Sequence, residues 1–222
     1  MIKTIKKGAR VQITEHFNSR EYDCRCNICS TTKYYEELFM LLEVLRKNIR
    51  KPIDITGSGY RCAAHNAEVA NASKDSNHMK GSAADITVKG MSVKTLAKAA
   101  ETAGFTGIIR YDKSNFVHVD LRPKHFYTTD TGSKYKTVDT FGGSPKCPFP
   151  EPSATVALGS SGDAARWLEW HLLMLGYTAT LNGSITAAEI NTLKKAQKKL
   201  GLEQDGRCGP ASKKALKKAV TQ

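Results

Sequence analysis

The sequence predicts an α+β domain followed by a small all-α bundle. An amphipathic pattern at helical spacing over residues 33–50 and an alternating pattern over residues 116–121 indicate the mixed domain. Beyond Leu158 the composition changes, and three helical patterns with their own start and stop signals follow. A chain of 222 residues has room for one medium and one small domain of these two classes.

The first domain is expected to mix short strands with two helices. The apolar stripe of residues 33–50 is followed by Pro52, which cannot continue a helix. Ser92 can cap a second helix, and Gly104 can end it. The expected elements, in order, are a short strand or entry segment at 11–13, a helix at 33–50, strands at 52–56 and 83–88, a helix at 92–103, and strands at 105–111 and 116–120 joined by a turn at 112–115.

A proline-rich stretch is expected to separate the two domains. Residues 145–152 hold four prolines, which exclude a helix or a central strand. We therefore expect residues 131–157 to form a semi-rigid linker between a first domain at residues 1–130 and a second domain at residues 158–222.

Local signals delimit the three helices of the second domain. The first ends at Gly176, and Thr186 with Glu189 forms the capping box of the second. Pro210 occupies the start of the third helix. Three short helices are enough for a small bundle.

The charge balance narrows the choice of partners. Lysine and arginine number 34 against 21 acidic residues, a net charge of +13 that favours a polyanionic partner. The anionic polymers of a bacterial wall fit this charge, and so does a solvated basic surface without a dedicated partner. No nucleic acid is expected, because no reader motif accompanies the charge. We also expect a monomer without membrane insertion, since no apolar run has the length of a membrane-spanning helix.

Two segments of the first domain offer ligands for one metal ion. His78 lies in a polar loop and Asp85 follows seven residues later in a strand, while His118 and Asp120 share one face of another strand. Two polar residues on one face of an apolar strand need partners, because unpaired burial costs several kcal/mol. Catalytic zinc takes three protein ligands and keeps one position open. We expect His78, Asp85 and His118 to bind Zn²⁺; the alternative is one loop histidine and one ordinary core histidine.

The combined pattern resembles the Ser-x-His-x-x-Gly-x-Ala-x-Asp and His-x-Asp/His signature of the zinc D-alanyl-D-alanine carboxypeptidase and endopeptidase family, whose fold is shared by the hedgehog signalling domain. The first motif is matched at all five fixed positions, by Ser76, His78, Gly81, Ala83 and Asp85. The resemblance implies a hedgehog-like fold with a small antiparallel sheet and flanking helices. It further implies a zinc metallopeptidase that hydrolyses an amide bond in the stem peptide or cross-bridge of peptidoglycan.

The same resemblance suggests residues that meet the substrate. Ser58-Gly59-Tyr60-Arg61 followed by Asn66 is similar to a segment in which the arginine binds substrate or the developing oxyanion. Ser76 is expected to add a hydrogen bond near the site.

The general base is where this chain departs from the family. Many members carry Asp or Glu three residues before the last zinc histidine, where this chain has Asn115, and an amide cannot act as a base. Asp120 is expected to serve either as the base or as support for the metal. Asp112 and His125 are weaker candidates. A catalytically silent, zinc-containing wall-binding protein is the alternative function.

Three cysteines within six residues, Cys24, Cys26 and Cys29, have the spacing of metal ligands, and a fourth, Cys62, lies near the proposed site. A structural zinc, one or two disulfides formed after release from the cell, and unpaired thiols are the three alternatives. Cys147 and Cys208 lie far along the chain and could pair only with each other or stay free.

The second domain resembles the three-helix peptidoglycan-binding domain attached to wall hydrolases. The matching groups are Gly162-Asp163 with Arg166-Trp167-Leu168, Leu175-Gly176-Tyr177, and Gly201-Leu202 with Asp205-Gly206. The Leu-Gln and Phe-Gln pairs usual in that family are here Leu168-Glu169 and Ala196-Gln197. A basic bundle that only stabilises the enzyme is the alternative.

The beginning of the chain suggests where the protein would act. Residues 1–10 are basic and are not followed by the apolar stretch of a signal peptide. We therefore expect synthesis in the cytoplasm and action at the wall after release, either as a phage endolysin or through non-classical export.

Overall fold

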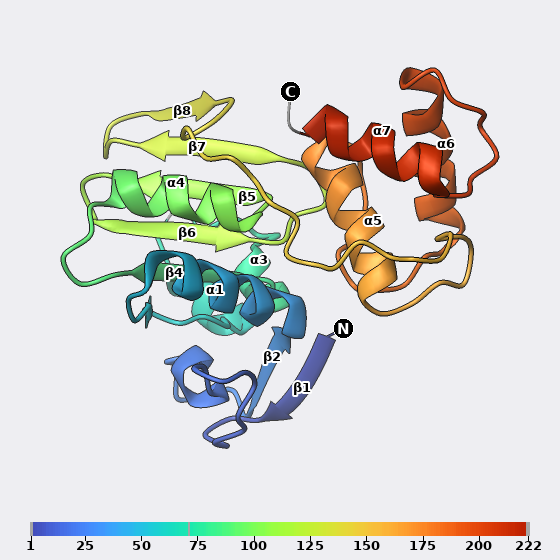
Figure 1. Cartoon of the computed structure of the whole chain (residues 1–222). Helices are drawn as coiled ribbons and strands as arrows, with labels where there is room; N and C mark the ends of the chain where they lie inside the picture. The colour runs from blue at the N-terminus through green and yellow to red at the C-terminus, as the bar shows by residue number, and fades with distance from the viewer. Residues whose placement is uncertain (1, 71, 221–222) are drawn as a thin grey trace. The chain divides into compact units, whose positions relative to one another are not determined.

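The computed structural model describes residues 2–70 and 72–220, which divide into two compact units (Figure 1). The first unit comprises the residues up to Arg122 together with Phe126–Gly143, and the second comprises Pro123–His125 and the residues from Ser144 onward. The first unit mixes strands and helices, and the second contains three α-helices among its described residues. The predicted fold class, an α+β domain and an all-α bundle, is confirmed.

A six-stranded sheet organises the first unit. Its strands, in spatial order, are β3 (Asp54–Thr56), β4 (Ala83–Thr87), β6 (Phe116–Asp120), β5 (Gly107–Tyr111), β7 (Phe126–Asp130) and β8 (Tyr135–Val138). Neighbours are antiparallel except β5 and β7, which are parallel. The sheet is larger than expected. Its last two strands, β7 and β8, were not predicted; β7 ends where the predicted first domain ends, at residue 130, and β8 lies beyond it.

A second, two-stranded antiparallel sheet pairs β1 (Ile2–Lys6) with β2 (Thr31–Tyr35). The strand expected at residues 11–13 is reduced to a single bridge between Gln12 and Asn18. Because β2 takes up residues 31–35, the first helix begins later than predicted.

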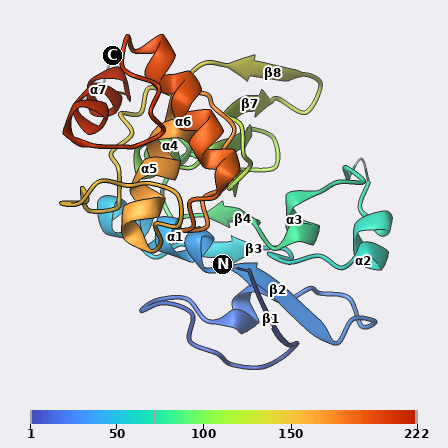
Figure 2. The same cartoon turned by 90° about the vertical axis from the view of Figure 1, so that its right-hand side faces the viewer.

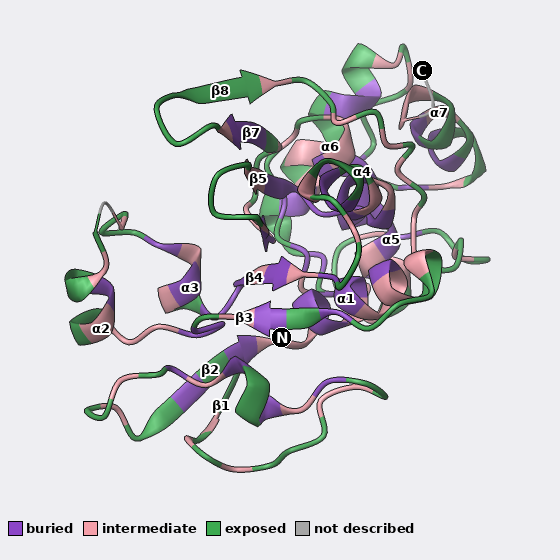
Figure 3. Cartoon of the chain, turned by 90° about the vertical axis from the view of Figure 1, so that its left-hand side faces the viewer, coloured by how far each residue is buried: buried purple, intermediate pink, exposed green. Residues whose placement is uncertain are grey.

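Two helices form the core with the sheet. α4 (Val93–Ala103) packs against β5 and β6, and α1 (Glu36–Ile49) packs against α4. Both begin and end at local signals: Ser92 and Gly104 flank α4, and the left-handed Arg50, rather than Pro52, ends α1. Figure 3 shows buried residues concentrated on these two helices and on the central strands. The fully buried side chains of the helices include Leu38, Leu41, Leu42, Leu45, Ala97 and Ala100.

The segment predicted as a linker is divided between the two units. In the first unit, the carboxylate of Glu101 accepts hydrogen bonds from Thr140 Oγ1 at 2.7 Å and from the backbone N–H groups of Phe141 and Gly143 at 2.8 and 2.7 Å. In the second unit, Val156 is buried and pairs with Cys208. The prolines exclude regular structure, but they do not prevent the flanking residues from packing.

The second unit contains α5 (Asp163–Met174), α6 (Ala187–Lys199) and α7 (Pro210–Val220), and α5 packs against both of the others (Figure 2). The capping box of Thr186 and Glu189 is present as predicted. The buried carboxylate of Glu169 accepts three backbone N–H groups of residues 182–184, at 2.9 to 3.1 Å, and so fixes the loop between α5 and α6. None of the helices within the described residues is both long and apolar enough to cross a membrane.

The second unit should become less stable in mild acid, because its buried His171 resists protonation in the folded state. Burial lowers the pKa of His171 from 6.5 to about 4, and its Nδ1–H donates to Trp167 O at 2.7 Å. The unfolded chain therefore takes up the proton first as the pH falls from 6.5 towards 4. On this linkage we expect the His171 contribution to be about 2 kcal/mol smaller at pH 5 than at pH 7.

Urea unfolding followed by tryptophan fluorescence measures this effect, because both tryptophans of the chain, Trp167 and Trp170, lie in α5. Glu169 titrates in the opposite sense, since burial raises its pKa to about 7. The readout is therefore the difference between wild type and His171→Gln at each pH. A difference that does not change with pH would contradict the prediction.

Candidate metal centre

The structure brings together the three predicted ligands His78, Asp85 and His118. His78 Nε2 lies 3.1 Å from His118 Nδ1, and Asp85 Oδ1 lies 2.9 Å from His118 Nδ1 and 3.4 Å from His78 Nε2. Strand pairing explains part of this convergence, because Asp85 of β4 is directly opposite His118 of β6. One ion could contact all three atoms.

His78 reaches the site from a single helical turn, α3 (Asn77–Lys80), and not from the expected loop. Ser76 Oγ caps this turn by accepting the backbone N–H of His78 at 3.3 Å. Gly81 ends it with a φ of +75°, and a Cβ there would lie 2.5 Å from Lys33 O. The hydroxyl of Ser76, predicted to meet the substrate, thus has a structural role in orienting His78.

Hydrogen bonds fix which nitrogen of each histidine faces the cluster. His78 Nδ1 lies 2.7 Å from Gly59 O and must donate to it, which leaves the lone pair on Nε2. His118 Nε2 lies 3.0 Å from Asp120 Oδ2, so Nδ1, which lies 2.9 Å from Asp85 Oδ1, is the nitrogen that would bind an ion once it carries no proton. The two nitrogens that face Asp85 are therefore Nε2 of His78 and Nδ1 of His118, and both must be unprotonated to bind a metal ion.

Asp120 is fully buried and held by Arg122, a residue that the sequence reasoning missed. Its Oδ1 accepts the backbone N–H and the Nε–H of Arg122, both at 2.9 Å, and Arg122 Nη2 contacts Oδ2. Burial raises the pKa of Asp120, but Arg122 and His118 outweigh it and hold the pKa well below its usual range. An ionised carboxylate engaged on both oxygens indicates support for His118 more than proton transfer.

The sequence contains a signal for Arg122. It is the next residue in the alternation that places His118 and Asp120 on one face, although it lies just past the end of β6. Gly107, opposite Asp120 on β5, makes room for the pair: a Cβ there would lie 1.9 Å from Asp120 Oδ1.

Arg61 lies beside the centre through its backbone, whose N–H donates to His78 O at 3.2 Å. Its side-chain Nε is buried and has no hydrogen-bond partner within the described residues. Unpaired buried donors are uncommon, which makes this side chain a candidate for binding an anionic ligand. The weaker base candidates are placed elsewhere: Asp112 pairs with Arg110 at 2.7 and 2.9 Å, and His125 belongs to the second unit.

The donor set suits zinc. Two imidazole nitrogens and one carboxylate oxygen are the ligands of many catalytic zinc sites. The far nitrogen of each imidazole is already hydrogen-bonded, which is the arrangement that holds metal-binding histidines in place.

A separate group of four sulfur atoms is formed by the predicted cysteines Cys24, Cys26, Cys29 and Cys62, all within 4.8 Å of one another. The six cysteines, all within the described residues, are unbridged. Cys147 and Cys208 are not part of this group.

Removing the charge of Asp120 should weaken metal binding. Asp120→Asn loses the ion pair with Arg122 and the carboxylate that orients His118, so we expect a zinc affinity roughly 10- to 100-fold lower. Titration against a chromophoric chelator measures this change. Asp112→Asn, an exposed carboxylate of the same unit, is the matched control and should keep wild-type affinity. Equal affinity in both variants would remove the supporting role of Asp120.

Three comparisons show which known proteins this chain is similar to. Residues 15–120 match the family model of Peptidase M15. Peptidoglycan L,D-endopeptidase MepK of Escherichia coli K12 is 36% identical over 93 residues, which cover 40% of this chain and 50% of that protein. Probable peptidoglycan L,D-endopeptidase MepK of Haemophilus influenzae is 36% identical over 69 residues, which cover 29% of this chain and 37% of that protein.

The chain thus spans half or less of the length of these relatives. A solved peptidoglycan-binding protein of Clostridioides difficile, in complex with glutamine hydroxamate, is 22% identical and covers 49% of this chain and 64% of its own. Its TM-score of 0.30 does not establish a shared fold. The segment of residues 15–120, just under half of the chain, is therefore similar to the Peptidase M15 family.

Proposed function

We propose that this protein is a zinc-dependent peptidase that hydrolyses an amide bond in bacterial peptidoglycan. The observation that carries the proposal is the convergence of His78, Asp85 and His118. In both imidazoles, the nitrogen that faces away from the cluster is hydrogen-bonded, to Gly59 O in His78 and to the Asp120 carboxylate in His118. The match to Peptidase M15 and the names of the relatives, peptidoglycan L,D-endopeptidases, support the substrate class.

Three groups of the chain would act around the ion. His78, Asp85 and His118 would hold zinc, which would supply Lewis acidity for hydrolysis of the amide bond. Arg61 would bind a substrate carboxylate or the developing oxyanion, because its guanidinium has an unpaired buried donor. Asp120, kept ionised by Arg122, would hold His118 in its ligating orientation.

The names of the relatives favour cleavage of an internal peptide bond. A carboxypeptidase that removes terminal D-alanine would use the same metal ligands. The fragments released from the wall distinguish the two.

A second candidate function is suggested because both positions considered first for the general base are unsuited to accept a proton. Asp120 is occupied by Arg122 and His118, and position 115, where the family resemblance implies an acid, is the amide Asn115. A catalytically silent, zinc-containing wall-binding protein would have this same arrangement.

The second unit is proposed to bind peptidoglycan and anionic wall polymers. Its three helices in the predicted order and its lysine-rich α6 and α7 support this role. A peptidase joined to a wall-binding unit would suit an endolysin that acts after release from the cytoplasm. Expression with and without a membrane-lesion-forming partner separates this route from export without one.

Digestion of purified peptidoglycan with mass spectrometry of the fragments tests the activity. We expect wild-type protein to release peptide fragments, and the release to stop with chelator and return with zinc. His118→Ala should reduce the rate to background, because one of three metal ligands is lost. Asp112→Asn serves as the control variant that keeps the centre intact. Unchanged fragments from wild-type protein with zinc present would favour the silent wall-binding alternative.

Arg61 should contribute to the rate through its donors. Arg61→Ala should lower kcat by roughly 10²- to 10³-fold if the guanidinium stabilises the oxyanion. Arg61→Lys should recover only part of this loss, since an ammonium lacks the rigid fork. Arg10→Ala removes an exposed arginine of the same unit and should have no effect. A wild-type rate for Arg61→Ala would exclude the proposed role.

A further inference from the structure

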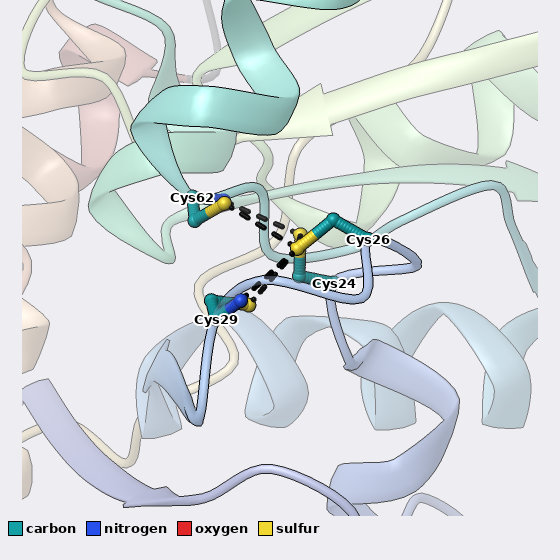
Figure 4. Close-up of side chains that lie close together, drawn as sticks. All are labelled: Cys24, Cys26, Cys29 and Cys62. Carbon is teal, nitrogen blue, oxygen red and sulfur yellow. Dashed lines mark hydrogen bonds between the residues drawn. The ribbon is translucent and has the colours of Figure 1, made fainter.

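Four cysteine sulfurs converge on one point of the first unit, apart from the His78 centre (Figure 4). Cys26 Sγ is the shared neighbour: it lies 3.4 Å from Cys24 Sγ, 3.3 Å from Cys29 Sγ and 3.5 Å from Cys62 Sγ. Three of the sulfurs come from one loop, and the fourth comes from the residue that caps α2 (Ala63–Glu68).

These separations fit a shared ion better than disulfide bonds. A disulfide needs its sulfurs about 2.05 Å apart and joins them in pairs. Cys26 is instead nearly equidistant from three other sulfurs and could bond to only one of them. Tetrahedral zinc with Zn–S bonds of about 2.3 Å holds its sulfurs roughly 3.8 Å apart, which is close to the observed distances.

The surroundings of the sulfurs suit thiolates. The backbone N–H groups of Cys29, Cys62 and His65 donate to Cys26, Cys24 and Cys62 Sγ, each at 3.4 Å. His65 Nδ1 also lies 3.2 Å from Cys24 Sγ, and Lys7 Nζ donates to Cys26 O. Four thiolates around a divalent ion carry a net charge of −2, and such donors offset it.

We propose that Cys24, Cys26, Cys29 and Cys62 bind one zinc ion as a closed, structural site. Four sulfur ligands complete the tetrahedral sphere and leave no position for a substrate. Thiolate ligands also favour zinc or iron over the harder cations. The inference does not depend on the peptidase activity.

The site would hold a loop that has little apolar packing of its own. Cys24 is buried, but Ile28 is 71% exposed. Small segments without a core commonly depend on a structural metal. Zinc would therefore supply the tertiary constraint that the side chains of this loop do not.

The same zinc site would stabilise residues 58–62, the segment that contains Arg61 and the carbonyl group bonded to His78. Arg25 N donates to Ser58 Oγ at 2.9 Å, and Tyr60 N donates to Tyr22 O at 2.7 Å. Gly59 is packed so closely that a Cβ would lie 2.0 Å from the Tyr22 ring, and its carbonyl holds His78. Cys62 is the last residue of this segment, so zinc bound to its sulfur would hold that end in place.

Cobalt substitution of the full-length wild-type protein tests the site directly. Co²⁺ bound to thiolates gives a sulfur-to-cobalt charge-transfer absorption, whereas the His78, Asp85 and His118 centre has no sulfur ligand. We expect this absorption in wild type and in His118→Ala, and a marked weakening of it in Cys29→Ser, which removes one of the four thiolates. Cys147→Ser is the matched control, because Cys147 is outside the cluster and burial raises its pKa to about 12.

Metal content provides a second measurement on the purified protein. We expect two zinc ions per chain in wild type and in Cys147→Ser, and one in Cys29→Ser or His118→Ala. Absence of the charge-transfer absorption from wild type, or an intact mass that matches two disulfides, would overturn the proposal. Iron in place of zinc would overturn the choice of metal. An inactive protein that keeps the absorption would instead count against the peptidase function alone.

Discussion

The register between β4 and β6 is the constraint on which the candidate site depends. Pairing places Asp85 opposite His118, two residues that lie far apart in the sequence. A slip of one residue would turn either side chain to the other face of the sheet and separate the ligands. The buried neighbours Ile86, Val117 and Val119 resist such a slip, because it would expose them. The apolar core beneath the sheet therefore fixes the metal geometry above it.

Buried carboxylates in both units have hydrogen-bond partners. Asp120 is compensated by Arg122 and His118, Glu101 by donors from residues 140–143, and Glu169 by backbone N–H groups of residues 182–184. An isolated buried carboxylate would cost several kcal/mol. These carboxylates each tie a loop or ligand to a helix or strand, so polar contacts determine the detailed shape that apolar packing leaves open.

The segment from Ser58 to Cys62 connects the two clusters of potential metal ligands. Gly59 O accepts a hydrogen bond from one ligand of the first, His78, and Cys62 is itself part of the second. Arg61 lies between them and bonds to His78 through its backbone. A site that must hold reactive groups to within a fraction of an ångström benefits from such bracing. A metal ion held by the cysteine cluster would therefore also help to hold His78 in position.

The sequence by itself determined the features that depend on neighbouring residues. Caps at Ser92, Gly104 and Thr186 marked helix ends, because these signals act within one turn, and alternation placed His118 and Asp120 on one face. Only the tertiary structure decided the features that require distant partners. The parallel pairing of β7 with β5 and the hydrogen bonds that residues 140–143 donate to Glu101 are of this kind. Local signals act within a few residues, whereas these contacts arise from packing between segments that are far apart in the chain.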